Sequence, residues 1–130
     1  MTRNAISSPD APKAVGPYSQ AVVSGDHVFL SGQTPIDPAS GALIDGSLAE
    51  QTQRCFDNLA SVLEAAALGF GDVVKVNVYL TSMADFTEMN GVYARQFDEP
   101  FPARTTVAVA ALPLGARVEI ELVARRRESR

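Results

Sequence analysis

The chain has 130 residues, of which 46% are hydrophobic and 20% charged, and its formal net charge at pH 7 is -4. This length is typical of one domain, so we expect a single domain over residues 1–130. The negative charge argues against nucleic-acid binding, which needs a basic surface. The sequence contains no apolar run long enough to cross a membrane and no apolar core of a secretion signal. We therefore expect a cytoplasmic protein that does not act on nucleic acids or membranes.

The chain contains one cysteine, Cys55, and one histidine, His27. A single thiol excludes an internal disulfide and a thiolate zinc cluster. A single imidazole excludes a multi-histidine metal site, and the position of His27 at a predicted hairpin tip argues against a histidine-based triad. We therefore expect chemistry without a metal, and Cys55 as a small core residue.

The first predicted elements are two strands, over residues 21–23 and 27–30, joined by the tight turn Ser24-Gly25-Asp26. Residues 42–44 predict a short strand. A helix is then predicted over 48–68, because Ser47 and Glu50 fit a capping box and Gly69 suits a left-handed stop. Its apolar positions recur at helical spacing: Leu48, Cys55, Leu59, Val62, Leu63 and Ala66.

The clearest strand is predicted over 73–80, with one alternating face formed by Val74, Val76, Val78 and Leu80 and the other carrying Lys75, Asn77 and Tyr79. A second helix is predicted over 85–97, since Asp85 and Glu88 offer another capping signature and Pro100 forbids further helix. Two strands, around 104–111 and 118–125, flank the turn-forming segment at 113–115 and predict a closing hairpin.

These elements predict a two-layer α+β domain in which two helices cover one face of a mixed, mainly antiparallel sheet. The strands carry more apolar residues than one covered face requires. We therefore expect the other face to be buried against further copies of the chain.

Arg104 places a charge in an otherwise apolar run. Its planar donor fork usually binds a carboxylate or a phosphate, although an arginine in this position can also lie on the surface with its stem on apolar neighbours. Glu119 and Glu121 share a face of the last strand. Two alternatives stay open for these carboxylates: exposure to water, or service as a proton acceptor in a partly dry cleft. In a tight hairpin centred on Leu114, Arg104 and Glu119 would lie roughly 16 Å apart along the strands, so a shared pocket would draw them from different chains.

Four blocks of sequence occur in order at compatible spacing: residues 14–21 (AVGPYSQA), 30–33 (LSGQ), 101–104 (FPAR) and 118–121 (VEIE). Together they resemble the RidA family of reactive intermediate deaminases, also called YjgF-like proteins, over nearly the whole chain. The resemblance implies a chorismate-mutase-like fold and a homotrimer. In such a trimer the sheets line a central barrel, and three active sites lie between subunits.

The resemblance also implies an activity, that of a 2-iminobutanoate/2-iminopropanoate deaminase. Such a hydrolase converts 2-imino acids and their enamine forms to 2-keto acids and ammonia without a metal or cofactor. By this resemblance Arg104 would hold the substrate carboxylate, Glu119 would activate water, and Tyr18 would hydrogen-bond near the imine nitrogen. Substrate binding is further expected at Gly32, at Asn90 and at Thr106, which stands where many members carry a cysteine.

Several alternatives stay open at this point. Tyr18 would instead be a core residue and Asn90 an exposed helical residue if neither serves the site. Two further functions are possible for the chain as a whole: a non-enzymatic module that binds or senses small carboxylates, and a specialised deaminase of a catabolic pathway. A ribonuclease or chaperone activity, also reported in this family, is disfavoured by the acidic net charge.

Overall fold

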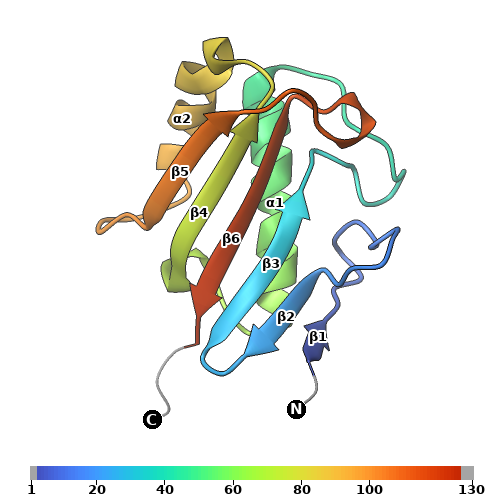
Figure 1. The fold of residues 1–130 in the computed structure, drawn as a ribbon, viewed down its shortest axis with the longest axis vertical. Helices are drawn as coiled ribbons and strands as arrows, with labels where there is room; N and C mark the ends of the chain where they lie inside the picture. The colour runs from blue at the N-terminus through green and yellow to red at the C-terminus, as the bar shows by residue number, and fades with distance from the viewer. Residues whose placement is uncertain (1–2, 127–130) are drawn as a thin grey trace.

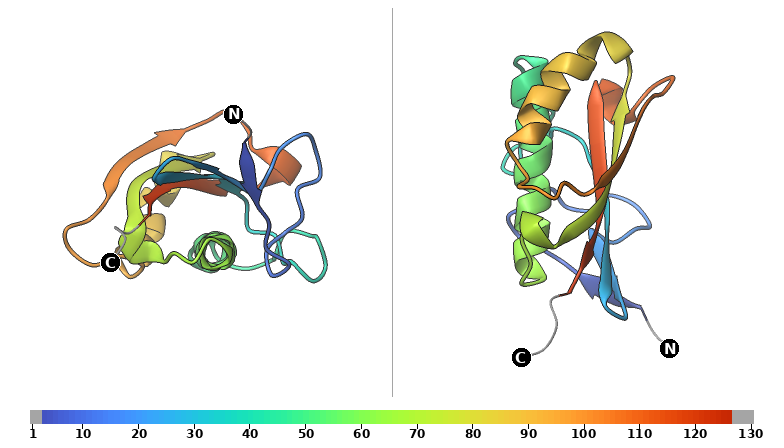
Figure 2. Two further views of the ribbon diagram at one scale, coloured as in Figure 1. Left: turned by 90° about the horizontal axis from the view of Figure 1, so that it is seen from below. Right: turned by 90° about the vertical axis from the view of Figure 1, so that its left-hand side faces the viewer.

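A computed structural model of the chain describes residues 3–126 and shows two helices packed on one face of a single sheet (Figures 1 and 2). The expected two-layer α+β architecture is confirmed. The strand order is β1-β2-β3-β6-β4-β5. The strands are β1 (Asn4–Ile6), β2 (Ala21–Ser24), β3 (His27–Gln33), β4 (Val73–Leu80), β5 (Ala103–Ala108) and β6 (Val118–Arg125). The α-helices are α1 (Leu48–Ala65) and α2 (Phe86–Ala94), with 3-10 turns η1 (Phe70–Asp72), η2 (Met83–Asp85) and η3 (Pro113–Gly115).

The predicted opening hairpin is confirmed, with Ser24 paired to His27 and Gly25 in the turn at a φ of 60°. No local pattern predicted β1, which pairs antiparallel with β2 at the edge of the sheet. The short strand expected over 42–44 is reduced to one bridge between Ile36 and Leu43.

Helix α1 begins as predicted, because the Ser47 side chain accepts from the Glu50 amide and Glu50 accepts from the Ser47 amide. Its end differs from the prediction. Ala67, not Gly69, adopts the left-handed conformation, with a φ of 61°. The amides of Ala67 and Leu68 then donate to the carbonyls of Glu64 and Leu63, which closes the helix in a Schellman motif.

Strand β4 is confirmed, but one of its face assignments was wrong. Val76, Val78 and Leu80 are buried beneath the helices, whereas Val74 is exposed. The pairing of β4 with β6 shifts between Val73 and Lys75, so Val73 takes the buried position in place of Val74.

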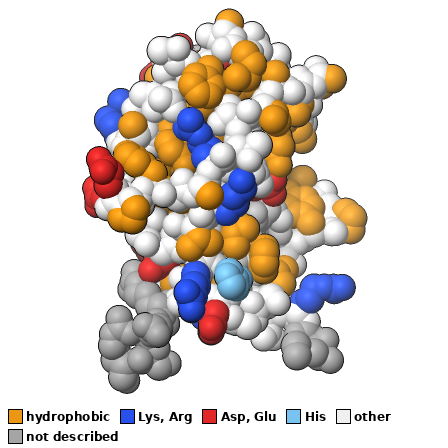
Figure 3. Space-filling view, turned by 60° about the vertical axis from the view of Figure 1, so that its left-hand side comes forward, with side chains coloured by type: hydrophobic (Ala, Val, Ile, Leu, Met, Phe, Trp, Pro, Cys, Tyr) orange, Lys and Arg blue, Asp and Glu red, His pale blue; other side chains and the backbone are white. Residues whose placement is uncertain are grey.

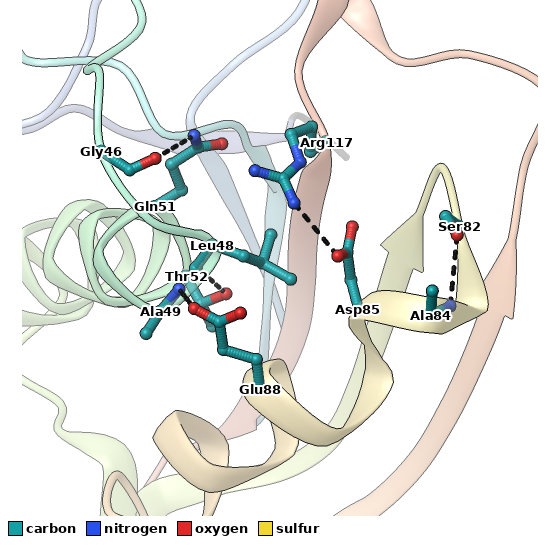
Figure 4. A network of polar contacts seen from close by, with 10 residues as sticks. All are labelled: Gly46, Leu48, Ala49, Gln51, Thr52, Ser82, Ala84, Asp85, Glu88 and Arg117. Carbon is teal, nitrogen blue, oxygen red and sulfur yellow. Dashed lines mark hydrogen bonds and ion pairs between the residues drawn. The ribbon is translucent and has the colours of Figure 1, made fainter.

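Helix α2 is shorter than predicted and is not capped by Asp85, which makes no capping hydrogen bond. Instead, Asp85 forms an ion pair of 3.0 Å with Arg117, and Glu88 accepts from the amide of Ala49 (Figure 4). These two contacts tie α2 to the segment before β6 and to the first turn of α1. The tertiary partners therefore take both acidic groups that the sequence suggested for capping.

The predicted closing hairpin was wrong. Strand β4 lies between the last two strands, antiparallel to β6 and parallel to β5. Ala108 and Val118 are both level with Leu80, on opposite sides of β4, so residues 109–117 must cross two strand spacings, about 9.5 Å. A tight turn cannot make that crossing, and the chain bridges it through η3.

The core lies between the helices and the sheet and includes Cys55, which is fully buried, as expected. Within residues 3–126, no helix has the length and apolar character needed to cross a membrane. Over the same residues, the acidic, histidine and cysteine side chains form no group of three that could hold a metal ion.

Candidate functional site

Arg104 lies on edge strand β5 with its side chain on the helix-covered side of the sheet. Its Nη1 donates to Oδ1 of Asn90 at 2.7 Å. The guanidinium carbon lies 4.5 Å from the ring centroid of Tyr93 and 5.5 Å from that of Phe86. One hydrogen bond and two cation–π contacts from α2 therefore hold a partly buried guanidinium in place.

This guanidinium has no carboxylate partner among the described residues, where the bond to Asn90 is its single hydrogen bond. It lines a cavity of about 390 Å³ together with Asn90, Tyr93, Ala94, Phe101 and Pro102. A partly buried cation normally has an anionic partner. The remaining donors of Arg104 are therefore placed to bind an anion such as a carboxylate.

Two hydroxyl groups beside Arg104 are buried without a hydrogen-bond partner: those of Tyr93 and Thr106. Thr106 follows two residues after Arg104, so both project to the same side of β5. Burial raises the pKa of Tyr93, and the positive charge of Arg104 opposes this effect. Unpartnered buried hydroxyls are uncommon in proteins, and here they offer hydrogen bonds to a molecule held by Arg104.

Glu119 lies on β6, on the side of the sheet that the helices leave uncovered. Its carboxylate occupies the space beside Gly32, where a Cβ atom would lie 2.0 Å from Glu119 Oε2. Strand β3 runs through Gly32, but its pairing with β6 is irregular between Leu30 and Gln33, as is common where a strand contains glycine. Gly32 thus lets the carboxylate lie against the main chain of β3.

The Glu119 carboxylate accepts no hydrogen bond from the residues that the structure describes. Its pKa is raised, chiefly because the group is partly buried and secondarily because Glu121 is negatively charged. A carboxylate with this environment binds a proton more readily than one in water. Glu119 is therefore suited to accept a proton from a reacting group.

Tyr18 is 51% exposed, so the alternative that it is a core residue is wrong. It follows Gly16-Pro17 and lines a cavity of about 470 Å³ whose walls include Gly32, Gln33 and Leu114. Tyr18 and Gly32 therefore contribute to one cavity, and Glu119 adjoins it through Gly32.

The sheet separates five of the six candidate residues into two groups. Arg104 is level with Val76, whose side chain is buried under the helices, and Glu119 is level with Tyr79, which points to the other face. Arg104, Asn90 and Thr106 lie on the helix-covered side, whereas Glu119 and Gly32 lie toward the open side. The predicted hairpin from which the separation of Arg104 and Glu119 was estimated was wrong. These two side chains still cannot meet within one chain, because they lie on opposite faces of the sheet.

Sequence reasoning did not assign a role to Tyr93 and Phe86, which hold the Arg104 guanidinium, nor to Tyr79, which donates to Glu121. The helical spacing of Phe86 and Tyr93 indicated only core packing. Their contact with Arg104 depends on how α2 lies against β5. The alternation of β4 placed Tyr79 correctly on its face but could not identify its partner.

Comparison with known proteins identifies the group to which the chain is related. The family model described as Endoribonuclease L-PSP matches residues 8–126. This chain belongs to the RidA, or YjgF-like, family. The match spans nearly all of the described residues, and it confirms the resemblance and the fold expected from the four sequence blocks.

Relatives within the RidA family carry several names. The human 2-iminobutanoate/2-iminopropanoate deaminase is 44% identical over 124 residues, covering 95% of this chain and 90% of the human protein. A RutC family protein of Pyrococcus horikoshii is 45% identical over 122 residues, covering 94% of this chain and 97% of that protein.

Solved structures of RidA-family proteins match the whole fold. RidA from the Antarctic bacterium Psychrobacter has a TM-score of 0.90 and 45% identity, covering 95% of this chain and 99% of that one. Escherichia coli TdcF with bound serine has a TM-score of 0.90 and 38% identity, with the same coverage of 95% and 99%.

Proposed function

We propose that this RidA-family chain is a hydrolase that converts 2-iminobutanoate and 2-iminopropanoate to 2-keto acids and ammonia, without a metal or cofactor. The observation that carries the proposal is the state of Arg104. Its guanidinium is held by Asn90 and two aromatic rings, has no carboxylate partner among the described residues, and lines a cavity. Such a group suits a small substrate that carries a carboxylate.

Binding begins at Arg104, whose guanidinium N–H groups that are not bonded to Asn90 donate hydrogen bonds to the substrate carboxylate. Asn90 fixes the guanidinium in the required orientation, and the Thr106 hydroxyl adds a hydrogen bond. Fixing the carboxylate positions the adjacent imine carbon, which converts the reaction with water into an oriented encounter. This role requires only a hydroxyl group, so it does not depend on the cysteine that many family members carry at the position of Thr106.

Hydrolysis then follows at the imine carbon. Glu119 takes a proton from water as the water oxygen bonds to this carbon and the π electrons of the C=N bond move to nitrogen. That proton passes from Glu119 to nitrogen. The C–N bond then breaks, the hydroxyl proton passes to the departing ammonia to give ammonium, and the carbonyl forms. One protonated imine and one water give one keto acid and one ammonium ion. The raised proton affinity of Glu119 serves both proton transfers.

Tyr18 and Gly32 complete the water side of the site. The exposed phenol of Tyr18 lines the same cavity as Gly32 and can hydrogen-bond near the imine nitrogen. The main chain at Gly32 lies beside the Glu119 carboxylate and offers a close approach for substrate.

Assembly of the two groups requires more than one subunit, because the sheet separates Arg104 from Glu119. A homotrimer with sites between subunits, as the family resemblance implies, would bring Arg104 of one copy toward Glu119 of the next. The uncovered face carries exposed apolar side chains, among them Phe29 and Val107, that a neighbouring copy would bury. Hydrophobic side chains are also exposed on the side that bears β5 (Figure 3).

The names of the relatives support this proposal. The human protein and its bovine counterpart are named as deaminases of these two imines, at 44% and 46% identity. A second candidate function, capture of small carboxylates without turnover, is favoured by the bound serine in the structure of TdcF. Ligand capture requires Arg104 but not Glu119, so the two functions are separable by mutation.

The test uses a dehydratase to generate 2-aminoacrylate or 2-iminobutanoate from serine or threonine, and measures the release of keto acid and ammonia. We expect the protein to accelerate release and Arg104→Ala to abolish the acceleration. Glu119→Gln should slow turnover and still bind a keto acid in calorimetry. Arg95→Ala, which removes an exposed arginine on α2's C-terminal side, is the matched control.

Two results would contradict the proposal. Binding of the keto acid without any acceleration by the wild-type protein would establish the capture function instead. Normal turnover by Glu119→Gln would remove the assigned role of that residue.

A further inference from the structure

We infer that Glu121 is a positioning residue, held in place by Tyr79 and Asn77, whose negative charge makes the neighbouring Glu119 a better proton acceptor. This inference rests on the proposed function, in which Glu119 activates water. It assigns a task to three polar residues on the uncovered face of the sheet that the mechanism above does not use.

The pairing of β4 with β6 establishes the geometry. Glu119 and Glu121 project to the same side of β6, about 6.6 Å apart along the strand. Tyr79 is level with Glu119, and Asn77 is level with Glu121. The Tyr79 hydroxyl nevertheless donates diagonally to Oε1 of Glu121, and Nδ2 of Asn77 donates to the same oxygen at 3.4 Å.

The two carboxylates therefore have different surroundings. Glu121 accepts two hydrogen bonds, which hold its carboxylate in place, whereas Glu119 accepts none from the described residues. The hydrogen bond to Glu121 is the main cause that raises the pKa of Tyr79 to about 12, so the phenol stays a donor at neutral pH. The pair is therefore asymmetric, because donors hold one carboxylate and leave the other open to a reacting molecule.

Other groups around Glu119 do not duplicate this charge. Arg117, two residues earlier, is engaged with Asp85, and Lys75, farther along β4, donates to Thr105. Behind the strand, the thiol of Cys55 is neutral because burial raises its pKa. On β3, Gly32 has no side chain. Among the described residues that flank Glu119, Glu121 is thus the neighbouring carboxylate on the same face of the sheet.

For the reaction, the charge of Glu121 would make Glu119 able both to accept a proton and to release it. Glu119 must take a proton from water and return one to the leaving nitrogen. Proton transfer in both directions is most efficient when the pKa of the catalytic group lies near the working pH. Tyr79 and Asn77 would keep Glu121 at the distance that sets this affinity.

The experiment compares Glu121→Gln with the wild-type protein. This variant removes the charge but keeps an oxygen that accepts from Tyr79 and Asn77. We expect the acid limb of the pH profile of kcat/KM to move to lower pH and the plateau rate to fall roughly two- to tenfold. Keto-acid binding through Arg104 should stay unchanged. Tyr79→Phe, which loosens Glu121 without removing its charge, should move the limb in the same direction by less.

Direct titration of the Glu119 carboxyl carbon by NMR, assigned with Glu119→Gln, measures the same property without turnover. We expect the Glu119 titration to move to lower pH in Glu121→Gln and to stay in place in Glu64→Gln, which removes an exposed carboxylate on α1. An unchanged Glu119 titration in Glu121→Gln would overturn the inference. If the titration moves but the wild-type protein shows no deaminase activity, the charge effect stands and the proposed function fails.

Discussion

Gly32 is the residue on which the position of Glu119 depends. The carboxylate fills the space where any other residue would place its Cβ, at 2.0 Å from Oε2. The φ of Gly32 does not lie in the left-handed region, so its backbone tolerates another residue. A substitution there is therefore expected to move the Glu119 side chain and leave the fold intact.

We predict that Gly32→Ala lowers deaminase turnover by roughly two orders of magnitude, because a misplaced catalytic group can cost that much. Circular dichroism should show the wild-type spectrum. Gly71→Ala is the control, since a Cβ at Gly71 meets nothing within 4 Å. Wild-type turnover in Gly32→Ala would show that the Glu119 position is not critical.

Glu119 also has a predictable effect on stability. Because its pKa is raised in the folded state, ionisation costs stability as the pH rises above the ordinary glutamate value and through the folded pKa. Glu119→Gln should therefore unfold at higher denaturant concentration than wild type near neutral pH. This advantage should shrink in acid, below the ordinary glutamate pKa. An advantage that is independent of pH would mean that the carboxylate charge is not its cause.

At the scale of elements, the end of α1 carries a conformational cost that the sequence does not reveal. Ala67 holds a φ of 61° so that the Schellman hydrogen bonds can form. A residue with a Cβ pays about 1 kcal/mol or more for this conformation, whereas glycine does not.

We predict that Ala67→Gly raises the free energy of unfolding by about 1 kcal/mol, measured by urea denaturation. Ala66→Gly is the matched control, because Ala66 has a φ of -95° and should gain nothing. Equal effects of the two substitutions would exclude relief of the left-handed conformation as the cause.

At the scale of the whole molecule, the placement of Arg104 and Glu119 on opposite faces makes the proposed activity a property of the assembly. A chain with Arg104→Ala retains Glu119, and a chain with Glu119→Gln retains Arg104. If each site draws the two residues from neighbouring copies, a mixed oligomer contains some intact sites.

We predict that co-refolding Arg104→Ala and Glu119→Gln chains in equal amounts restores roughly a quarter of the wild-type activity, by random pairing of neighbours. Each variant refolded alone should stay inactive or slow. If both residues served a site within one chain, mixing would restore nothing. Size-exclusion chromatography with light scattering would report the subunit number of the mixture.

Local patterns in the sequence were sufficient for much of the fold. Alternation predicted β4 and β6, the turn Ser24-Gly25-Asp26 predicted the first hairpin, and Ser47 with Glu50 located the start of α1. These signals depend on neighbouring residues only, so they can be read along the chain. The same is true of the four blocks that resembled the RidA family.

Strand pairing and the environment of the site depended on the tertiary structure. The sequence suggested that 104–111 and 118–125 pair directly, but β4 comes between them because strand neighbours are chosen by packing across the whole sheet. The rings around Arg104, the space at Gly32 and the bond from Tyr79 to Glu121 follow from that arrangement. Local sequence patterns established which groups are present and, except for Val74, which face of its strand each occupies. Only the folded chain decided which of them meet, because contacts between distant residues depend on the order of strands and not on local periodicity.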